Sequence, residues 1–177
     1  DFKYIYFWEY FHRLWARSLG FVFLIPFLYF VSTKKIDRSL MKRLAVVILL
    51  TALTASAGWI MVASGLVNRP WVNAYKLTLH FMLAVLTISA MVWTIANTRQ
   101  TVYPESSCRN LVKSLLILTF LQLIVAGMMS GMKAGLYYPT WPDMNGTLIP
   151  EVLLDPDNWT WHNLTNYDSY LFTPALI

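Results

Sequence analysis

Two of the three histidines in the sequence lie inside long apolar segments, at comparable depths. At a helical rise of about 1.5 Å per residue, His12 would lie ~33 Å from Lys34, and His80 would lie ~28 Å from Arg99. Two imidazoles that face each other across an iron atom bind a haem axially, and this spacing predicts such a site. A zinc site is disfavoured because zinc usually takes three or four protein ligands. Histidines that only hydrogen-bond to another helix remain the alternative.

Four charged residues accompany these histidines. Glu9 shares a helix face with the first histidine, and Arg13 is placed four residues after Glu9, where the two can pair. Arg17 is the deepest charge in any apolar segment, and Lys76 lies one turn before the second histidine. Ionisable residues at membrane depth are functional candidates. The carboxylate could handle protons and the cations could neutralise haem propionates, or Arg13 and Lys76 could simply extend to the membrane interface.

The elements that must carry these residues are apolar segments. The 177 residues are 57% hydrophobic and 13% charged, whereas a soluble domain has about 25% charged residues. Since a membrane span takes about 20 residues, four stretches are long enough, at about 4–32, 44–67, 72–97 and 111–134. We therefore expect an all-α integral membrane protein with four transmembrane helices in residues 1–135. This composition excludes an ordinary soluble enzyme and a disordered chain.

The charged residues between the segments predict an orientation. Eight of the fourteen basic residues lie in the two connections at Thr33–Arg43 and Thr98–Lys113. Residues 136–177 carry Asp and Glu but no Lys or Arg. The positive-inside rule places both basic connections in the cytoplasm or the mitochondrial matrix, and residues 136–177 in an outer loop on the periplasmic or intermembrane-space side. Membrane topology explains the net charge of +5, so no nucleic-acid partner is expected.

Three glycines in the fourth segment, Gly127, Gly131 and Gly135, repeat at intervals of four. Small residues at this spacing allow a close approach in lipid. The repeat predicts tight packing against a partner helix or a flat cofactor. The ordinary glycine enrichment of membrane helices is the alternative.

Four blocks of the sequence resemble the haem A synthases, integral membrane enzymes that make haem A for cytochrome oxidase. Glu9–Arg13 matches their ExxHR motif, and Gly58–Leu66 resembles their GWxMVxSGL stretch. Tyr75–His80 resembles YRLxxH, with Lys76 in place of the usual Arg, and Ala134–Gly146 resembles AGxxYxTWPxMxG. The blocks follow the family order and cover almost the whole chain.

The resemblance implies an eight-helix architecture of two four-helix bundles, in which these segments would be the second to fifth spans. The chain would then be a fragment. His12 and His80 would be the axial ligands of the N-terminal haem, and Glu9 would be the acidic residue beside it. The implied reaction oxidises the C8 methyl group of haem O to a formyl group, with a haem b in the absent half as the electron-transfer cofactor.

The implied location is the bacterial cytoplasmic membrane or the mitochondrial inner membrane. The implied partners are haem O as substrate, membrane lipid, haem O synthase and cytochrome oxidase assembly factors. Association of the protein with further copies of itself is also compatible with the resemblance.

Two other functions stay open at this point. One is a bis-histidine transmembrane electron-transfer cytochrome that does not modify its haem, and the other is a membrane bundle without a cofactor. Glu9 beside His12, together with the Thr-Trp-Pro loop at 140–142, favours the enzyme.

Overall fold

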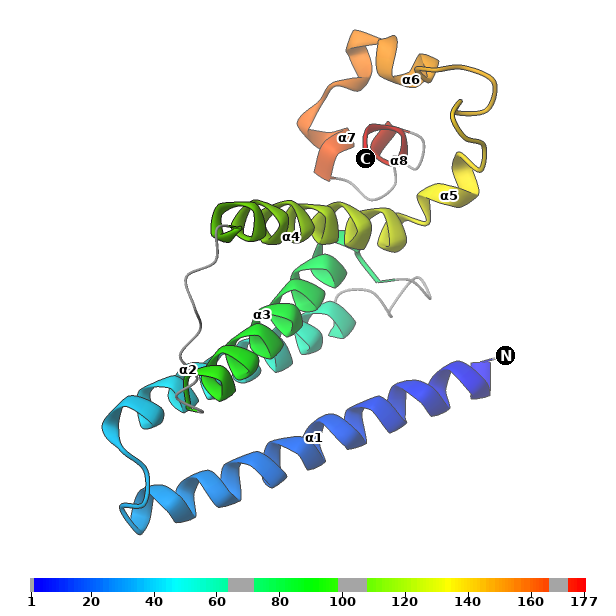
Figure 1. Ribbon diagram of the computed structural model, residues 1–177. Helices are drawn as coiled ribbons and strands as arrows, with labels where there is room; N and C mark the ends of the chain where they lie inside the picture. Colours follow the sequence, from blue (N-terminus) through cyan, green and yellow to red (C-terminus); the bar gives the residue numbers. More distant parts are fainter. Residues whose placement is uncertain (1, 64–71, 99–107, 166–171) are drawn as a thin grey trace. The chain divides into compact units, whose positions relative to one another are not determined.

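The long helices dominate the part of the chain that the computed structural model describes, which is residues 2–63, 72–98, 108–165 and 172–177 (Figure 1). They are α1 (Phe2–Ser32), α2 (Arg38–Ala63), α3 (Ala74–Thr98) and α4 (Arg109–Met132). All four are long and apolar enough to cross a membrane, which confirms the all-α fold class with four membrane-spanning helices. Short helices follow: α5 (Ala134–Tyr137), α6 (Glu151–Leu154), the 3₁₀ helix η1 (Pro156–Asn158), α7 (Trp161–Thr165) and α8 (Phe172–Leu176).

The chain divides into two compact units, Asp1–Ala45 and Val46–Ile177, and the division falls inside α2. In the first unit, the start of α2 is set by a cap. The Asp37 carboxylate accepts hydrogen bonds from the backbone N–H groups of Ser39 and Leu40, at 3.0 and 3.3 Å. A capped helix can begin in polar sequence, and α2 begins at Arg38, ahead of the apolar run expected from residue 44.

In the second unit, an asparagine cap starts α3. The Asn73 side-chain oxygen accepts hydrogen bonds from the N–H groups of Tyr75 and Lys76, at 3.0 and 3.3 Å. Further along, the hydroxyl groups of Thr54 on α2 and Thr87 on α3 are 3.2 Å apart and hydrogen-bonded. The expected end of the second segment near residue 67 and the basic residue at 99 lie outside the described residues.

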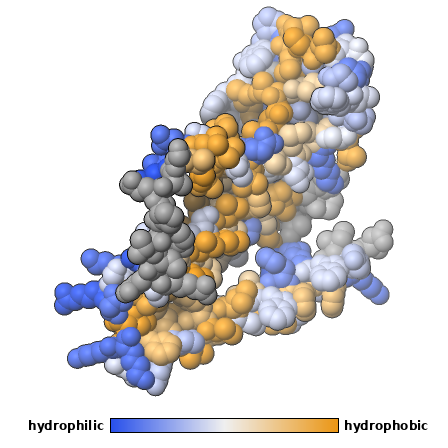
Figure 2. Space-filling model, viewed as in Figure 1, coloured by the Kyte–Doolittle hydropathy of each residue, from blue (hydrophilic) through white to orange (hydrophobic). Residues whose placement is uncertain are grey.

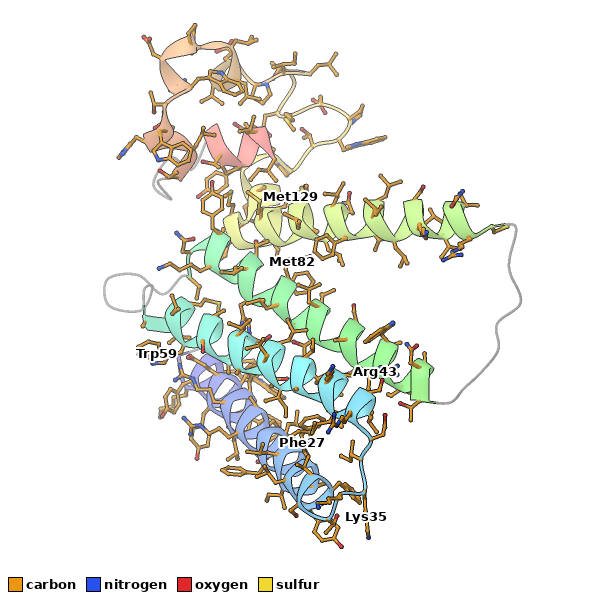
Figure 3. The ribbon with its side chains drawn as sticks, turned by 90° about the vertical axis from the view of Figure 1, so that its left-hand side faces the viewer. Phe27, Lys35, Arg43, Trp59, Met82 and Met129 are labelled. Carbon is orange, nitrogen blue, oxygen red and sulfur yellow. The ribbon has the colours of Figure 1, made fainter. Side chains whose placement is uncertain are left out.

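Glycines allow α4 to pack closely on α3. The two helices meet where α3 begins and α4 ends, and they diverge from that point (Figures 1 and 3). A Cβ atom at Gly131 would lie 2.8 Å from both Cα and Cβ of Ala74, and one at Gly127 would lie 3.1 Å from Thr78 Oγ1. Ala74 is fully buried there. The prediction of tight packing is therefore confirmed for these two glycines, and the partner is a helix.

Gly135 takes no part in this contact, since a Cβ atom there would meet no atom within 4 Å. The reason is that α4 ends at Met132 and the next residue, Lys133, is left-handed with φ of 54°. The chain turns there into α5, so Gly135 leaves the helix face that the other two glycines share.

Replacing Gly131 with valine in the full-length protein should lower its stability by about 1–3 kcal/mol, because the added side chain overpacks the contact and pushes the backbones of α3 and α4 apart. The nearest atom is a backbone Cα, which cannot move without separating the two helices. Thermal unfolding in detergent measures the effect. Gly135→Val is the matched control and should unfold close to the wild-type temperature. Equal effects of the two substitutions would contradict this account of the packing.

The short helices surround α8 beyond the end of α4. In Figure 1, α8 lies inside the ring that α5, α6 and α7 form, and its residues Thr173 and Ala175 are buried. The Tyr75 hydroxyl donates a hydrogen bond to the backbone carbonyl of Leu164 in α7, which ties these short helices to the first turn of α3.

Large apolar side chains lie exposed along the four long helices. On the face drawn in Figure 2, apolar residues cover much of the helix surfaces, and hydrophilic residues gather at the turn between α1 and α2. In a membrane, lipid and neighbouring helices cover surfaces of this kind.

Candidate functional site

The first group of site candidates lies on α1. Arg13 Nη2 donates to Glu9 Oε1 and forms a salt bridge, so the expected pairing at i,i+4 is present. The side chains of Glu9 and Arg13 are 36% and 46% exposed. His12, Arg13 and Arg17 are exposed, so the imidazole and both guanidinium groups are accessible from outside this unit. The salt bridge orients the carboxylate on the helix face that also carries His12.

Aromatic side chains flank this group at helical spacing. The Phe7 and Phe11 rings stack with centroids 6.0 Å apart, and Trp15 meets Phe11 edge-on at 6.0 Å. Tyr6 stacks on Tyr10 at 6.5 Å. These residues were not among the candidates predicted from the sequence, although their i,i+4 spacing is visible there. They line this part of α1 with exposed aromatic rings.

The second group lies on α3, where His80 and Lys76 are both half-buried. His80 Nδ1 is 2.9 Å from the backbone carbonyl oxygen of Thr54 on α2. A carbonyl oxygen can only accept, so Nδ1 carries the hydrogen and donates it. Nε2 then keeps the lone pair that a metal ion requires.

Gly58 on α2 is a site residue that sequence reasoning missed. A Cβ atom there would lie 2.9 Å from His80 Cε1 and 3.1 Å from Nδ1. Gly58 belongs to the block that resembles GWxMVxSGL, but nothing in that block indicates that the glycine faces a histidine ring. The neighbouring Trp59 is 73% exposed and projects outward from α2 (Figure 3).

His12 and His80 belong to different units, so the prediction that their rings face each other stays a prediction. Taken separately, the groups in each unit have the chemistry that a haem requires. In one unit these groups are the His12 imidazole and the cations Arg13 and Arg17, which could pair with propionates. In the other unit they are Lys76 and the His80 imidazole, whose tautomer is fixed by a carbonyl group.

The block at 134–146 forms an ordered turn. Asn145 and Gly146 have φ of 57° and 92°, and the Met144 N–H donates to the Thr147 carbonyl at 2.7 Å. Asn-Gly is the favoured pair for such a two-residue turn because both positions need positive φ. The Thr140 hydroxyl donates to the Asp143 carbonyl at 2.9 Å and accepts from the Asn145 N–H at 2.7 Å.

Residue Trp141 of the same block is 91% exposed. The turn therefore presents an indole ring on the surface of its unit, and indole rings favour membrane interfaces.

Residues 1–173 match the sequence model of a family described as cytochrome oxidase assembly protein. The chain belongs to this family. Together with four helices able to span a membrane, this makes the chain a multi-pass membrane protein of the cytochrome oxidase assembly family.

Relatives in this family carry the name Heme A synthase. The relative from Nitrosospira multiformis is 39% identical over 183 residues, which cover 100% of this chain and 51% of the relative. The relative from Parvibaculum lavamentivorans is 37% identical over 174 residues, covering 97% and 49%. The relative from Flavobacterium psychrophilum is 36% identical over 166 residues, covering 90% and 48%. The chain thus spans about half the length of these curated relatives. No solved structure matches the chain.

Proposed function

We propose that this chain is the part of a haem A synthase that comprises its second to fifth membrane spans, and that the complete enzyme oxidises the C8 methyl group of haem O to a formyl group for cytochrome oxidase assembly. The observation that carries the proposal is the family match over residues 1–173, joined by relatives named Heme A synthase that align along 90–100% of the chain. Glu9 is the catalytic carboxylate, and His12 and His80 are the axial ligands of the substrate haem.

Each residue has a separate task in this proposal. When haem O is bound, its iron and porphyrin supply the redox chemistry. His80 offers Nε2 as a ligand because Nδ1 is engaged by the Thr54 carbonyl, and His12 offers the second imidazole. Glu9 holds or moves a proton at a carboxylate oxygen whose orientation Arg13 restrains. The propionates are neutralised by Arg17, by Lys76 and by the guanidinium nitrogens of Arg13 that do not pair with Glu9.

The complete protein would have eight helices in two bundles, with residues 136–177 on the outer side of the membrane. The basic connections would then face the cytoplasm, as the positive-inside rule requires. The bacterial relatives favour the bacterial cytoplasmic membrane. A haem b in the second half would be the electron-transfer cofactor, and haem O synthase and oxidase assembly factors would be neighbours in the membrane.

The test is to express the full-length protein in a host that makes haem O but lacks haem A synthase. Haems extracted from the purified protein and the membranes are separated by chromatography and identified by mass and by the pyridine haemochrome spectrum. Haem A, which carries the formyl group, should accumulate only when the protein is present.

The second candidate, a bis-histidine electron-transfer cytochrome, gives a different result in the same experiment. Such a protein would bind haem with a low-spin spectrum and leave haem O unchanged. That outcome would contradict the proposed enzyme.

A further inference from the structure

At His80, the contact between α2 and α3 consists of a hydrogen bond to the Thr54 carbonyl and a close approach to Gly58, which has no side chain. In an α-helix the N–H of residue 58 donates to the carbonyl of residue 54, so Gly58 lies beside the Thr54 carbonyl. A Cβ atom at this position would overlap the imidazole, at 2.9 Å from Cε1. The absence of a side chain at Gly58 is therefore what lets the ring reach the carbonyl at 2.9 Å.

We propose that Gly58 and the Thr54 carbonyl together form a seat for the His80 imidazole, which fixes the Nδ1–H tautomer and presents Nε2 as the ligating nitrogen. The His80 seat, defined as these two groups, makes Gly58 a positioning residue that acts through His80. Its use in haem ligation rests on the proposed function, whereas the tautomer itself does not.

The chemistry of ligation explains why such a seat matters. A metal-bound histidine usually donates its second ring N–H to a carbonyl or carboxylate, which orients the ring and raises its basicity, and loss of the partner typically costs about 10–100-fold in affinity. At His80 the partner is a backbone carbonyl on a neighbouring helix. Because the acceptor belongs to the backbone, the identity of residue 54 does not determine whether it is present. The residue at position 58 determines whether the imidazole can reach this carbonyl.

The substitution that tests the seat is Gly58→Ala in the full-length protein. The overlapping atoms belong to a side chain, so the ring can swing away from α2 and the fold should survive. The matched control is Gly20→Ala, which places the same methyl group in the middle of α1, where it would meet no neighbouring atom within 4 Å.

The first measurement needs no haem. Solid-state nitrogen NMR of the haem-stripped protein, labelled with ¹⁵N-histidine, reports which ring nitrogen of His80 carries the hydrogen, with the signals assigned by their loss in His80→Asn. We expect the Nδ1–H form in the wild type and in Gly20→Ala, and a mixture of tautomers in Gly58→Ala. An Nε2–H form in the wild type, or a tautomer that Gly58→Ala leaves unchanged, would overturn the seat.

The second measurement is a haem titration followed by absorbance. We expect Gly58→Ala to weaken binding about 10–100-fold and to lower the low-spin fraction, while Gly20→Ala binds as the wild type does. Wild-type binding by Gly58→Ala would overturn the role of the seat in ligation. If His80→Asn also binds haem like the wild type, the proposed ligand is wrong, yet the tautomer result still decides whether the seat exists.

Discussion

Replacing Glu9 with glutamine in the full-length protein is expected to lower haem A formation by about 10²–10⁴-fold, the usual contribution of one positioned acid–base group. Haem should stay bound with near-normal absorbance, because glutamine keeps the size of the side chain and His12 is untouched. Glutamine cannot take up or release the proton that the carboxylate handles. Haem A produced per bound haem O is the quantity to measure, by chromatography of extracted haems.

Glu151→Gln is the matched control, since Glu151 is an exposed residue at the start of α6 and should leave turnover unchanged. Two results would count against a catalytic Glu9. Loss of haem and of thermal stability together would make Glu9 a structural partner of Arg13, with which it forms the salt bridge. Full haem A production would make it an interface charge.

Replacing His80 with alanine should remove one haem per chain and the corresponding low-spin absorbance, since the side chain is a proposed axial ligand. His12→Ala should have the same effect because both imidazoles are needed for six-coordinate iron. Added imidazole should restore part of the low-spin spectrum in His80→Ala by entering the space that the lost ring leaves. Haem content by pyridine haemochrome and absorbance spectra measure both effects.

His162→Ala provides the control, because this histidine lies in α7 and outside every block that resembles the family. It should keep full haem content. Haem content that is unchanged in His80→Ala, or lost equally in His162→Ala, would refute axial ligation by His80.

The four spans could be predicted because a run of about 20 apolar residues is a direct physical requirement of the bilayer. The start of α2 was placed too late for an identifiable reason. An apolar window ignores the Asp37 cap, which begins the helix in polar sequence at Arg38. The stripe of glycines was correctly interpreted at Gly127 and Gly131. It failed at Gly135 because a left-handed Lys133 ends the helix first, and a lysine gives no sequence signal for that conformation.

In the candidate site, too, some features could be predicted from the sequence and others could not. The pairing of Glu9 with Arg13 followed from spacing along one helix. The partner of His80 could not be predicted, because a backbone carbonyl has no residue identity and Thr54 is distant in sequence. The role of Gly58 could not be predicted either, because it depends on which ring of another helix packs against this glycine. The opposition of His12 and His80 is still a prediction from helix direction and depth.

The hydrogen bond from Tyr75 to Leu164 links α7 to the helix that carries His80. Proteins open locally in cooperative groups of contacts, and this bond places the end of α7 and the first turn of α3 in one such group. An opening of α7 that breaks the bond also loosens the turn that holds Lys76, one turn before His80. Order in α7 and rigidity at the candidate haem ligand are therefore thermodynamically coupled, and whatever stabilises one of them favours the other.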